Sequence, residues 1–231
     1  MAIVVADIHG DIEKARAFLD YKPETLHVAL GDYLDSFIEP FERQLECLQL
    51  LMESNAVLLL GNHEVHYLKE PLFQFAGYNV EYVQIIQEIL EENIKRFKAA
   101  YAVDGWLLTH AGVHQGITAH VNDVDKLAKM LQSQFERYLV KRFISKHSQY
   151  RYQSIFWFNF LVEGSIVAPN IKQIFGHVEI RQPEVRENYI ALDTTNFTNS
   201  CWLYDTQHRE LVQLPLPPKI GRVRFSGGGW S

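Results

Sequence analysis

Short runs of apolar residues recur along most of the chain, and polar residues or glycine follow each of them. The runs are four or five residues long and rich in Val, Ile and Leu, which is typical of strands buried on both faces of a sheet. They occupy residues 2–6, 26–30, 56–60, 106–109 and 171–175. The sequence therefore predicts five buried strands.

Between these runs, apolar residues repeat at the three- and four-residue spacing of amphipathic helices. Pro40 is expected as the first residue of the second helix, because proline fits the first turn. Alternating strands and helices indicate an α/β fold with the strands between layers of helices. The apolar faces of four predicted helices are Ile12, Ala15, Phe18 and Leu19; Phe41, Leu45, Leu48 and Met52; Tyr82, Ile86, Leu90 and Phe97; and Val124, Leu127, Leu131, Phe135, Leu139 and Phe143.

The last third of the chain has a different pattern. Residues 189–193, 201–205 and 210–214 are closely spaced apolar runs, which favours a second, more antiparallel sheet. We expect one domain over residues 1–220, with a helical cap insertion at 118–152, and a flexible glycine-rich tail over 221–231. The cations of the insertion would either face an anionic substrate or form a solvated helix face; they are Lys141, Arg142, Lys146, His147 and Arg151.

Composition and charge narrow the class of protein. The chain has 231 residues, of which 47% are hydrophobic and 22% charged, and this excludes intrinsic disorder. A net charge of −6 disfavours long nucleic acid as a partner, because the phosphate backbone requires a concentrated positive surface. No apolar run reaches the ~20 residues of a membrane span. With two cysteines, Cys47 and Cys201, and no signal peptide before Asp7, we expect a cytoplasmic protein.

Each of the five predicted strands is followed by residues that can bind metal ions or transfer protons. Ligands of open α/β sheets bind at the carboxyl ends of the strands, so we expect these side chains to line one crevice. Asp11 is expected to cap the helix that begins near Ile12. The segments are Asp7-Ile8-His9-Gly10-Asp11, Gly31-Asp32-Tyr33-Leu34-Asp35, Gly61-Asn62-His63-Glu64, His110-Ala111-Gly112-Val113-His114 and Gly176-His177.

The donor atoms indicate what the crevice can hold. Carboxylate, imidazole and amide groups without a thiolate suit Mn²⁺, Fe²⁺ or Zn²⁺. A single structural zinc ion usually takes four ligands, whereas this set offers more. Six ligands with one shared carboxylate suit two metal ions about 3.5–4 Å apart, which can act on the attacking and the leaving oxygen of a displacement.

The order of these segments resembles the calcineurin-like metallophosphoesterases, in particular their serine/threonine phosphoprotein phosphatase branch. The resemblance implies two packed mixed β-sheets flanked by helices. It also implies two divalent metal ions, with Mn²⁺ expected and iron or Zn²⁺ as alternatives, and Asp32 as the bridging ligand. His63 resembles the general acid of that family, and Asp35 the carboxylate that orients it. The implied metal ligands are Asp7, His9, Asp32, Asn62, His110 and His177.

The expected function is hydrolysis of phosphomonoesters, on phosphorylated small molecules or phosphoproteins, by direct attack of a metal-bridging hydroxide. His63 would protonate the leaving oxygen, which is worth about 10²–10⁴-fold. One alternative is a dinucleoside polyphosphate hydrolase, because residues 61–66 and 109–113 also resemble the symmetrical bis(nucleosyl) tetraphosphatases. Another is a metal-binding interaction module without catalysis, which would not need the pair His63 and Asp35.

Two positions depart from the family pattern. The phosphatases continue the second segment with Arg-Gly, and that arginine would bind a phosphate in a bidentate manner; this chain has Ser36-Phe37. Asn159, two residues after Trp157, stands where small bacterial members often have arginine. The loss implies weaker phosphate binding, a different substrate, or a replacement cation, for which the candidates are Arg151 and Arg181. His66 and His114 are not expected to bind metal.

Overall fold

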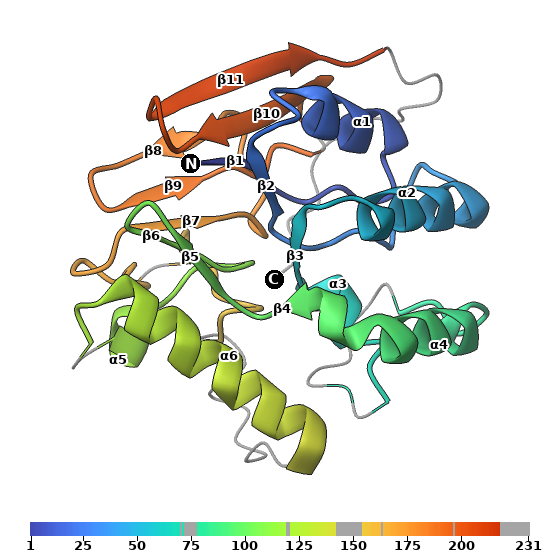
Figure 1. Cartoon of the computed structure of the whole chain (residues 1–231), viewed down its shortest axis with the longest axis horizontal. Coiled ribbons are helices and arrows are strands. Elements are labelled where there is room, and N and C mark those ends of the chain that lie inside the picture. Colours follow the sequence, from blue (N-terminus) through green and yellow to red (C-terminus); the bar gives the residue numbers. More distant parts are fainter. Residues whose placement is uncertain are drawn as a thin grey trace.

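Two β-sheets pack face to face in the structure, a computed structural model, and helices cover their outer surfaces (Figure 1). The structure describes residues 1–69, 71, 78–118, 121–141, 154–162, 164–195 and 197–217. Their helices are α1 (Ile12–Asp20), α2 (Phe41–Glu53), α3 (Asn62–Val65), α4 (Val83–Asn93), α5 (Gln115–Thr118) and α6 (Val124–Lys141). Their strands are β1 (Ala2–Val5), β2 (Leu26–Ala29), β3 (Val57–Leu59), β4 (Phe97–Lys98), β5 (Tyr101–Val103), β6 (Trp106–Leu108), β7 (Gln173–Phe175), β8 (Glu184–Val185), β9 (Tyr189–Ala191), β10 (Ser200–Asp205) and β11 (Glu210–Pro215).

Both sheets are mixed, as predicted. The first has the strand order β11-β10-β1-β2-β3-β4, in which β1 to β4 are parallel and the β10–β11 hairpin adds antiparallel to β1. The second has the order β5-β6-β7-β9-β8, in which β6, β7 and β9 are parallel and the edge strands β5 and β8 are antiparallel. The carboxyl ends of four parallel strands in the first sheet and three in the second are thus available to form a site.

Side chains of β1 alternate between two cores, because successive strand residues point to opposite faces. Ala2 and Val4 join an apolar cluster between the two sheets, whereas Ile3 and Val5 join the cluster that packs against helices. On the outer faces, α1 contacts α2 and β10, and α6 contacts β5 and β6 (Figure 1). This burial on both sides explains why β1 is a continuous apolar run.

The four predicted helices are present as α1, α2, α4 and α6, with corrections at their ends, and Phe143 lies outside the described residues. Asp11 caps α1, since its Oδ1 accepts a hydrogen bond from Lys14 N at 3.0 Å. Pro40 is the extended cap residue of α2 and not its first helical residue. Phe97 was wrongly placed on the third helix: α4 ends at Asn93, and Phe97 opens β4, where it pairs with Leu58 and is buried. A buried residue of the next strand can continue the spacing of the helix's apolar face, so spacing alone does not show where the helix ends.

The three apolar runs of the last third do not form one antiparallel sheet, and this prediction is wrong. β9 lies in the second sheet, parallel to β7, whereas β10 and β11 extend the first sheet beside β1. The apolar pattern along a strand indicates that the strand is buried. Which strands it pairs with depends on contacts with residues far away in the sequence, and the pattern does not show this.

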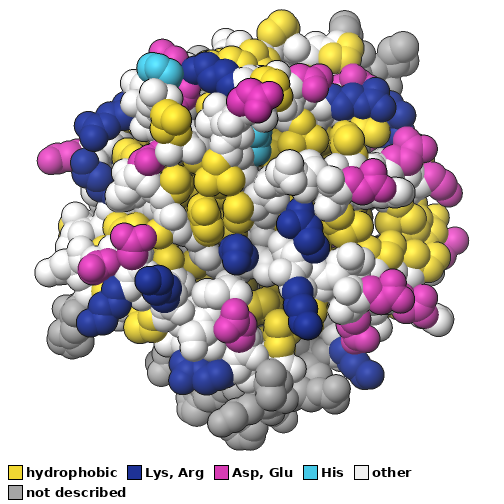
Figure 2. Space-filling view, in the orientation of Figure 1, with side chains coloured by type: hydrophobic (Ala, Val, Ile, Leu, Met, Phe, Trp, Pro, Cys, Tyr) yellow, Lys and Arg dark blue, Asp and Glu magenta, His cyan; other side chains and the backbone are white. Residues whose placement is uncertain are grey.

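Part of the predicted insertion is a flanking helix, because α6 lies against the second sheet. Arg142, Lys146, His147, Arg151 and the tail 221–231 lie outside the described residues. On the face drawn in Figure 2, basic and acidic side chains are interspersed. Within the described part of the chain, no helix is both long and apolar enough to cross a bilayer.

Candidate metal centre

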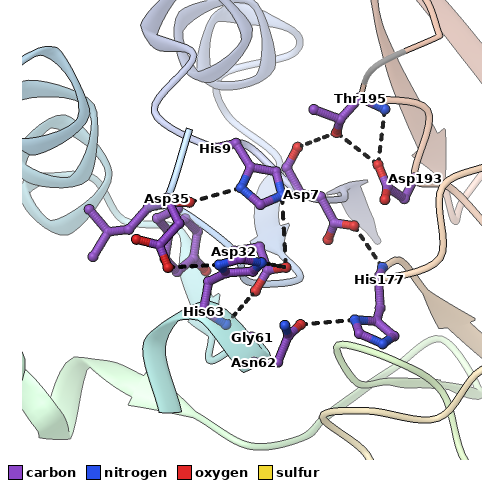
Figure 3. A network of polar contacts seen from close by, with 12 residues as sticks. Asp7, His9, Asp32, Asp35, Gly61, Asn62, His63, His177, Asp193 and Thr195 are labelled. Atoms are coloured by element: carbon purple, nitrogen blue, oxygen red, sulfur yellow. Dashed lines mark hydrogen bonds and ion pairs between the residues drawn. The ribbon is translucent and has the colours of Figure 1, made fainter. Parts of the chain in front are cut away.

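The predicted site residues follow five parallel strands that come from both sheets. β1, β2 and β3 of the first sheet and β6 and β7 of the second end at the same edge of the molecule. Figure 3 shows most of these side chains turned toward one another. Hydrogen bonds and short contacts connect all the predicted residues, which are Asp7, His9, Asp32, Asp35, Asn62, His63, His110 and His177.

Asp32 lies between two groups of possible ligand atoms. Its Oδ2 is 3.8 Å from His9 Nε2 and 3.4 Å from His110 Nε2. The atoms of each group lie within 4.8 Å of one another; one group is His9, Asp32 and His63, and the other is Asp32, His110 and His177. Asn62 Oδ1 adjoins the second group, at 2.7 Å from His110 Nε2 and 2.8 Å from His177 Nδ1. One carboxylate shared by two groups fits the predicted pair of metal ions.

Asp7 has a buried oxygen that suits a cation. Its Oδ2 accepts a hydrogen bond from His177 N at 2.6 Å. Its Oδ1 has no hydrogen-bond partner among the described residues and lies 3.6 Å from His110 Nδ1. A buried carboxylate oxygen without a partner is costly unless a positive charge meets it. The donor set therefore fits a metal ion at this position.

Burial shifts the pKa values of the candidate ligands toward their neutral forms, which suits the imidazoles as metal ligands but disfavours ionised carboxylates until a cation is present. Burial, aided by the charges of Asp193 and Asp32, raises the pKa of Asp7 well above its usual value. Burial also raises the pKa of Asp32 to about 8. Burial and the charge of His63 lower the pKa of His9 and of His177 to about 4. The imidazoles are thus neutral near pH 7 with a lone pair to donate, and the carboxylates ionise most readily beside a cation.

Tight backbone turns at the strand ends aim these side chains into the crevice. A left-handed backbone costs a non-glycine residue about 1–3 kcal/mol, although Asp and His adopt it more often than most. A Cβ on Gly61 would overlap the Asp32 carboxylate, and one on Gly176 would lie 2.7 Å from Asp7 Oδ1. The site residues with positive φ are Asp7 (34°), His9 (45°), Asp32 (53°), Asp35 (58°) and His177 (71°).

His63 and Asp35 form a hydrogen-bonded pair beside the ligands. His63 Nδ1 is 2.8 Å from Asp35 Oδ2, and its Nε2 is 3.9 Å from Asp32 Oδ2. The same Asp35 Oδ2 is 2.8 Å from His66 Nε2, and Tyr67 donates a hydrogen bond to Asp35 Oδ1 at 2.7 Å. His66 is therefore a buried neighbour of His63 that contacts the same carboxylate oxygen, and the two rings lie 5.6 Å apart between centroids.

The charges of this pair support an acid role for His63. Burial by itself lowers the pKa of His63, but the carboxylates of Asp32 and Asp35 more than offset this and raise it to about 9. Burial raises the pKa of Asp35, but hydrogen bonds from His63 and His66 bring it down to about 2. Near neutral pH, an imidazolium therefore faces an ionised carboxylate that fixes its orientation.

A cavity of about 190 Å³ opens onto these groups. Arg181 is exposed and does not line it, and Arg151 lies outside the described residues, so neither candidate cation is placed at the site. His114 also lies outside the lining, and its Nδ1 accepts a hydrogen bond from Gly116 N. The lining residues are Ile8, His9, Asp32, Ser36, Phe37, Ile38, Asn62, His63, His177, Glu179, Asp193 and Thr195.

The sequence analysis missed Asp193 and Thr195. Asp193 is buried, and its Oδ1 accepts a hydrogen bond from Thr195 N at 3.0 Å. The Thr195 hydroxyl lies 2.7 Å from Asp193 Oδ1 and 2.9 Å from Asp7 O. Both residues follow β9, which is parallel to β7. The strand-end rule would have found them if residues 189–193 had been assigned to a parallel sheet.

Comparisons with known proteins find similar solved structures. Among solved structures, a protein serine/threonine phosphatase from Saccharomyces cerevisiae, described as similar to human phosphatase PP5, is 14% identical with a TM-score of 0.58, over 95% of this chain and 81% of that chain. A metallophosphoesterase from Sphaerobacter thermophilus is 11% identical with a TM-score of 0.43, over 94% of this chain and 89% of that chain. A search of curated proteins finds no match.

The family model for calcineurin-like phosphoesterases matches residues 2–181. This range includes all five segments that follow the predicted strands, from Asp7 to His177. The yeast phosphatase structure shares the fold over most of both chains. The order of the segments, the two mixed sheets and the family match all lead to the same result, and the chain belongs to the calcineurin-like phosphoesterase family.

Proposed function

We propose that this chain hydrolyses phosphomonoesters, of phosphorylated small molecules or phosphoproteins, at a centre that holds two divalent metal ions. As a member of its family, it is a metal-dependent hydrolase that acts on phosphate esters. The observation that carries the finer proposal is the position of Asp32, whose Oδ2 is 3.8 Å from His9 Nε2 and 3.4 Å from His110 Nε2. The pair His63 and Asp35 stands at the same cavity.

We assign metal binding to six residues, with Asp32 shared between the two ions and Mn²⁺ as the preferred metal. When bound, two divalent cations supply a nucleophile from water near neutral pH and offset the negative charge that develops on the phosphoryl oxygens. Gly61 and Gly176 leave the space that these carboxylates need. The six residues are Asp7, His9, Asp32, Asn62, His110 and His177.

His63 gives the proton that the leaving oxygen requires. Asp35 accepts a hydrogen bond from Nδ1, which directs Nε2 toward the cavity and stabilises the imidazolium. His66 contacts the same Asp35 oxygen as His63, and Tyr67 donates to the other oxygen, so both residues help to hold the carboxylate in place. Because His63 Nε2 also lies in one of the ligand groups, the decisive experiment must separate an acid from a metal ligand.

The experiment compares the wild type with His63→Ala on phenyl phosphate and p-nitrophenyl phosphate, after the metal content of each protein has been measured. Phenolate is the poorer leaving group, so it depends more on a proton donor. We expect His63→Ala to retain its metal and to lose about 10²–10⁴-fold in kcat on phenyl phosphate, with a smaller loss on p-nitrophenyl phosphate. His114→Ala, which changes a histidine outside the cavity lining, serves as the matched control.

Equal losses on both substrates, or wild-type rates in His63→Ala, would rule out the acid role. Loss of one metal ion from His63→Ala would make His63 a ligand. A wild-type protein that turns over diadenosine tetraphosphate faster than any phosphomonoester would replace the ester by a phosphoanhydride substrate. No turnover of phosphomonoesters with Mn²⁺, Fe²⁺ or Zn²⁺ would refute the proposed function.

A further inference from the structure

A second cavity, of about 340 Å³, adjoins the one at the candidate metal centre. Ser36 and Phe37 line both cavities, and Asp35 lines the second while its partner His63 lines the first. The two cavities are therefore neighbours across the segment that follows Asp35. The remaining lining residues come from the start of α2 and the region of α4; they are Glu39, Phe41, Gln44, Asn79, Tyr82 and Ile86.

Phe37 stands at the boundary between the cavities and is 85% exposed. A ring this exposed contributes little to the stability of the fold. The turn that carries it is nevertheless well fixed, because Ser36 Oγ accepts hydrogen bonds from Ile38 N at 3.2 Å and Glu39 N at 3.0 Å. Ser36 N in turn donates to Gln44 Oε1 at 3.1 Å. Ser36, which replaces the arginine of the family pattern, thus holds an apolar ring at the cavity mouth.

The walls of the second cavity suit a neutral carbon skeleton. The rings of Phe41 and Tyr82 stack at 3.7 Å between centroids, and Ile86 is buried beside this part of the wall. Asp35 and Glu39 also line the cavity, and its described lining includes no lysine or arginine. Two carboxylates repel a further phosphate group, while the aromatic and aliphatic side chains gain free energy when they cover apolar surface.

We infer that Phe37 and the second cavity bind the alcohol portion of the phosphate ester, and that this portion is neutral and aromatic or otherwise apolar. The inference rests on the proposed function, in which the leaving oxygen lies next to His63. The carbon atoms attached to that oxygen must extend away from the metal ligands. Ser36 and Phe37 line both cavities, so the second cavity offers these carbon atoms an apolar space next to the first.

The test compares 3-phenylpropyl phosphate with propyl phosphate in the metal-loaded enzyme. Both are primary alkyl esters, so they place the same demand on the metal ions and on His63, and they differ only in the phenyl group. We expect kcat/KM to favour 3-phenylpropyl phosphate by about tenfold, mainly through KM, which is the low end for an apolar contact in a pocket. This ratio is measured in the wild type and does not depend on any variant.

Three variants locate the contact. Phe37→Ser is expected to bring the ratio close to one, and Phe37→Trp, which restores an aromatic surface, to keep it near tenfold. Val185→Ser changes a side chain that is 52% exposed on β8 and lines neither cavity, and it should keep the wild-type ratio. Thermal unfolding at the wild-type temperature would show that Phe37→Ser is folded.

A ratio near one in the wild type would overturn the inference while hydrolysis of both esters leaves the proposed function standing. A tenfold ratio that persists in folded Phe37→Ser would also overturn it, because the phenyl group would then bind elsewhere. If neither alkyl ester is hydrolysed while phenyl phosphate is, the inference fails and the proposed function stands; if phenyl phosphate is not hydrolysed either with Mn²⁺, Fe²⁺ or Zn²⁺, both fail.

Discussion

Replacing Asp35 by asparagine would remove a charge from the centre of the network behind His63. Oδ2 of the carboxylate lies 2.8 Å from both His63 Nδ1 and His66 Nε2, and Oδ1 accepts a hydrogen bond from Tyr67 at 2.7 Å. An amide has one acceptor oxygen and one NH₂ donor. Either the two imidazoles or the tyrosine must then face a donor. Because the volume hardly changes, the effect comes from the lost charge and acceptor and not from packing.

The size of the effect follows from the 2.8 Å contact between Asp35 and His63. An opposite charge this close shifts a pKa by about 1–3 units. Cations held by Asp32 would offset the charge of Asp32, which leaves Asp35 as the carboxylate that keeps His63 protonated. A general acid is active while it is protonated, so activity is lost as pH rises through its pKa. Asp35→Asn should therefore move the alkaline limb of kcat to lower pH by about 1–3 units, at about tenfold in rate per unit.

The measurement is the pH profile of kcat on phenyl phosphate for the wild type, Asp35→Asn and Asp104→Asn. We expect Asp35→Asn to lose about 10–10³-fold at pH 9 and less at pH 6. Asp104 contacts the terminal amine at 2.9 Å and lines neither cavity, so Asp104→Asn should keep the wild-type profile. An unchanged alkaline limb in Asp35→Asn, with metal retained, would refute the reasoning.

Two further predictions concern metal binding and stability. Gly61→Ala places a methyl group against the Asp32 carboxylate, and it should abolish the rise in unfolding temperature that Mn²⁺ causes in the wild type. At a Mn²⁺ concentration of 100 times Kd, that rise corresponds to a gain of about 2.7 kcal/mol in the free energy of unfolding. A wild-type rise in Gly61→Ala would contradict the close fit. Burial raises the pKa of Asp205, but hydrogen bonds from Lys22 at 2.6 Å and His208 at 2.9 Å hold it below its usual 3.8. This stabilisation is complete above about pH 4 and is lost as pH falls. We therefore expect urea unfolding to give Asp205→Asn a free energy of unfolding about 2 kcal/mol below that of the wild type at pH 7, and a smaller difference at pH 3. An equal difference at both pH values would contradict this reasoning.

The sequence predicted the buried strands well because burial on both faces leaves a plain signature. In β1, Ala2 and Val4 face the other sheet while Ile3 and Val5 face the helices, so every position had to be apolar. The strands that were missed, β4, β5 and β8, have two or three residues. Runs this short are too brief to show the two-residue periodicity of a strand. They form strands only because a neighbouring strand offers hydrogen bonds.

The site was predictable to the extent that it follows the ends of parallel strands. Convergence of the five segments needed only their order and the strand-end rule. The link between His66 and Asp35 needed the structure, because it depends on the short helix α3, which contains His63 and has His66 as its C-cap residue, so that both imidazoles reach Asp35. The resemblance selected His63 over His66 for the cavity, but it gave no indication that His66 contacts Asp35.

Glu64 shows how the segments hold one another in place. Its carboxylate is fully buried; Oε2 accepts hydrogen bonds from Asp32 N at 2.9 Å and Gly61 N at 2.8 Å, and Oε1 accepts one from Tyr33 N at 2.8 Å. These N–H groups follow β2 and β3, the strands that lead to Asp32 and Asn62. In the sequence Glu64 is only one more acidic residue among candidate ligands, yet it lines neither cavity. Hydrogen bonds from these buried backbone N–H groups to Glu64 thus fix the spacing between Asp32 and Asn62, the proposed shared ligand and amide ligand. The fold itself therefore holds these positions, which lowers the cost of ordering them around a cation.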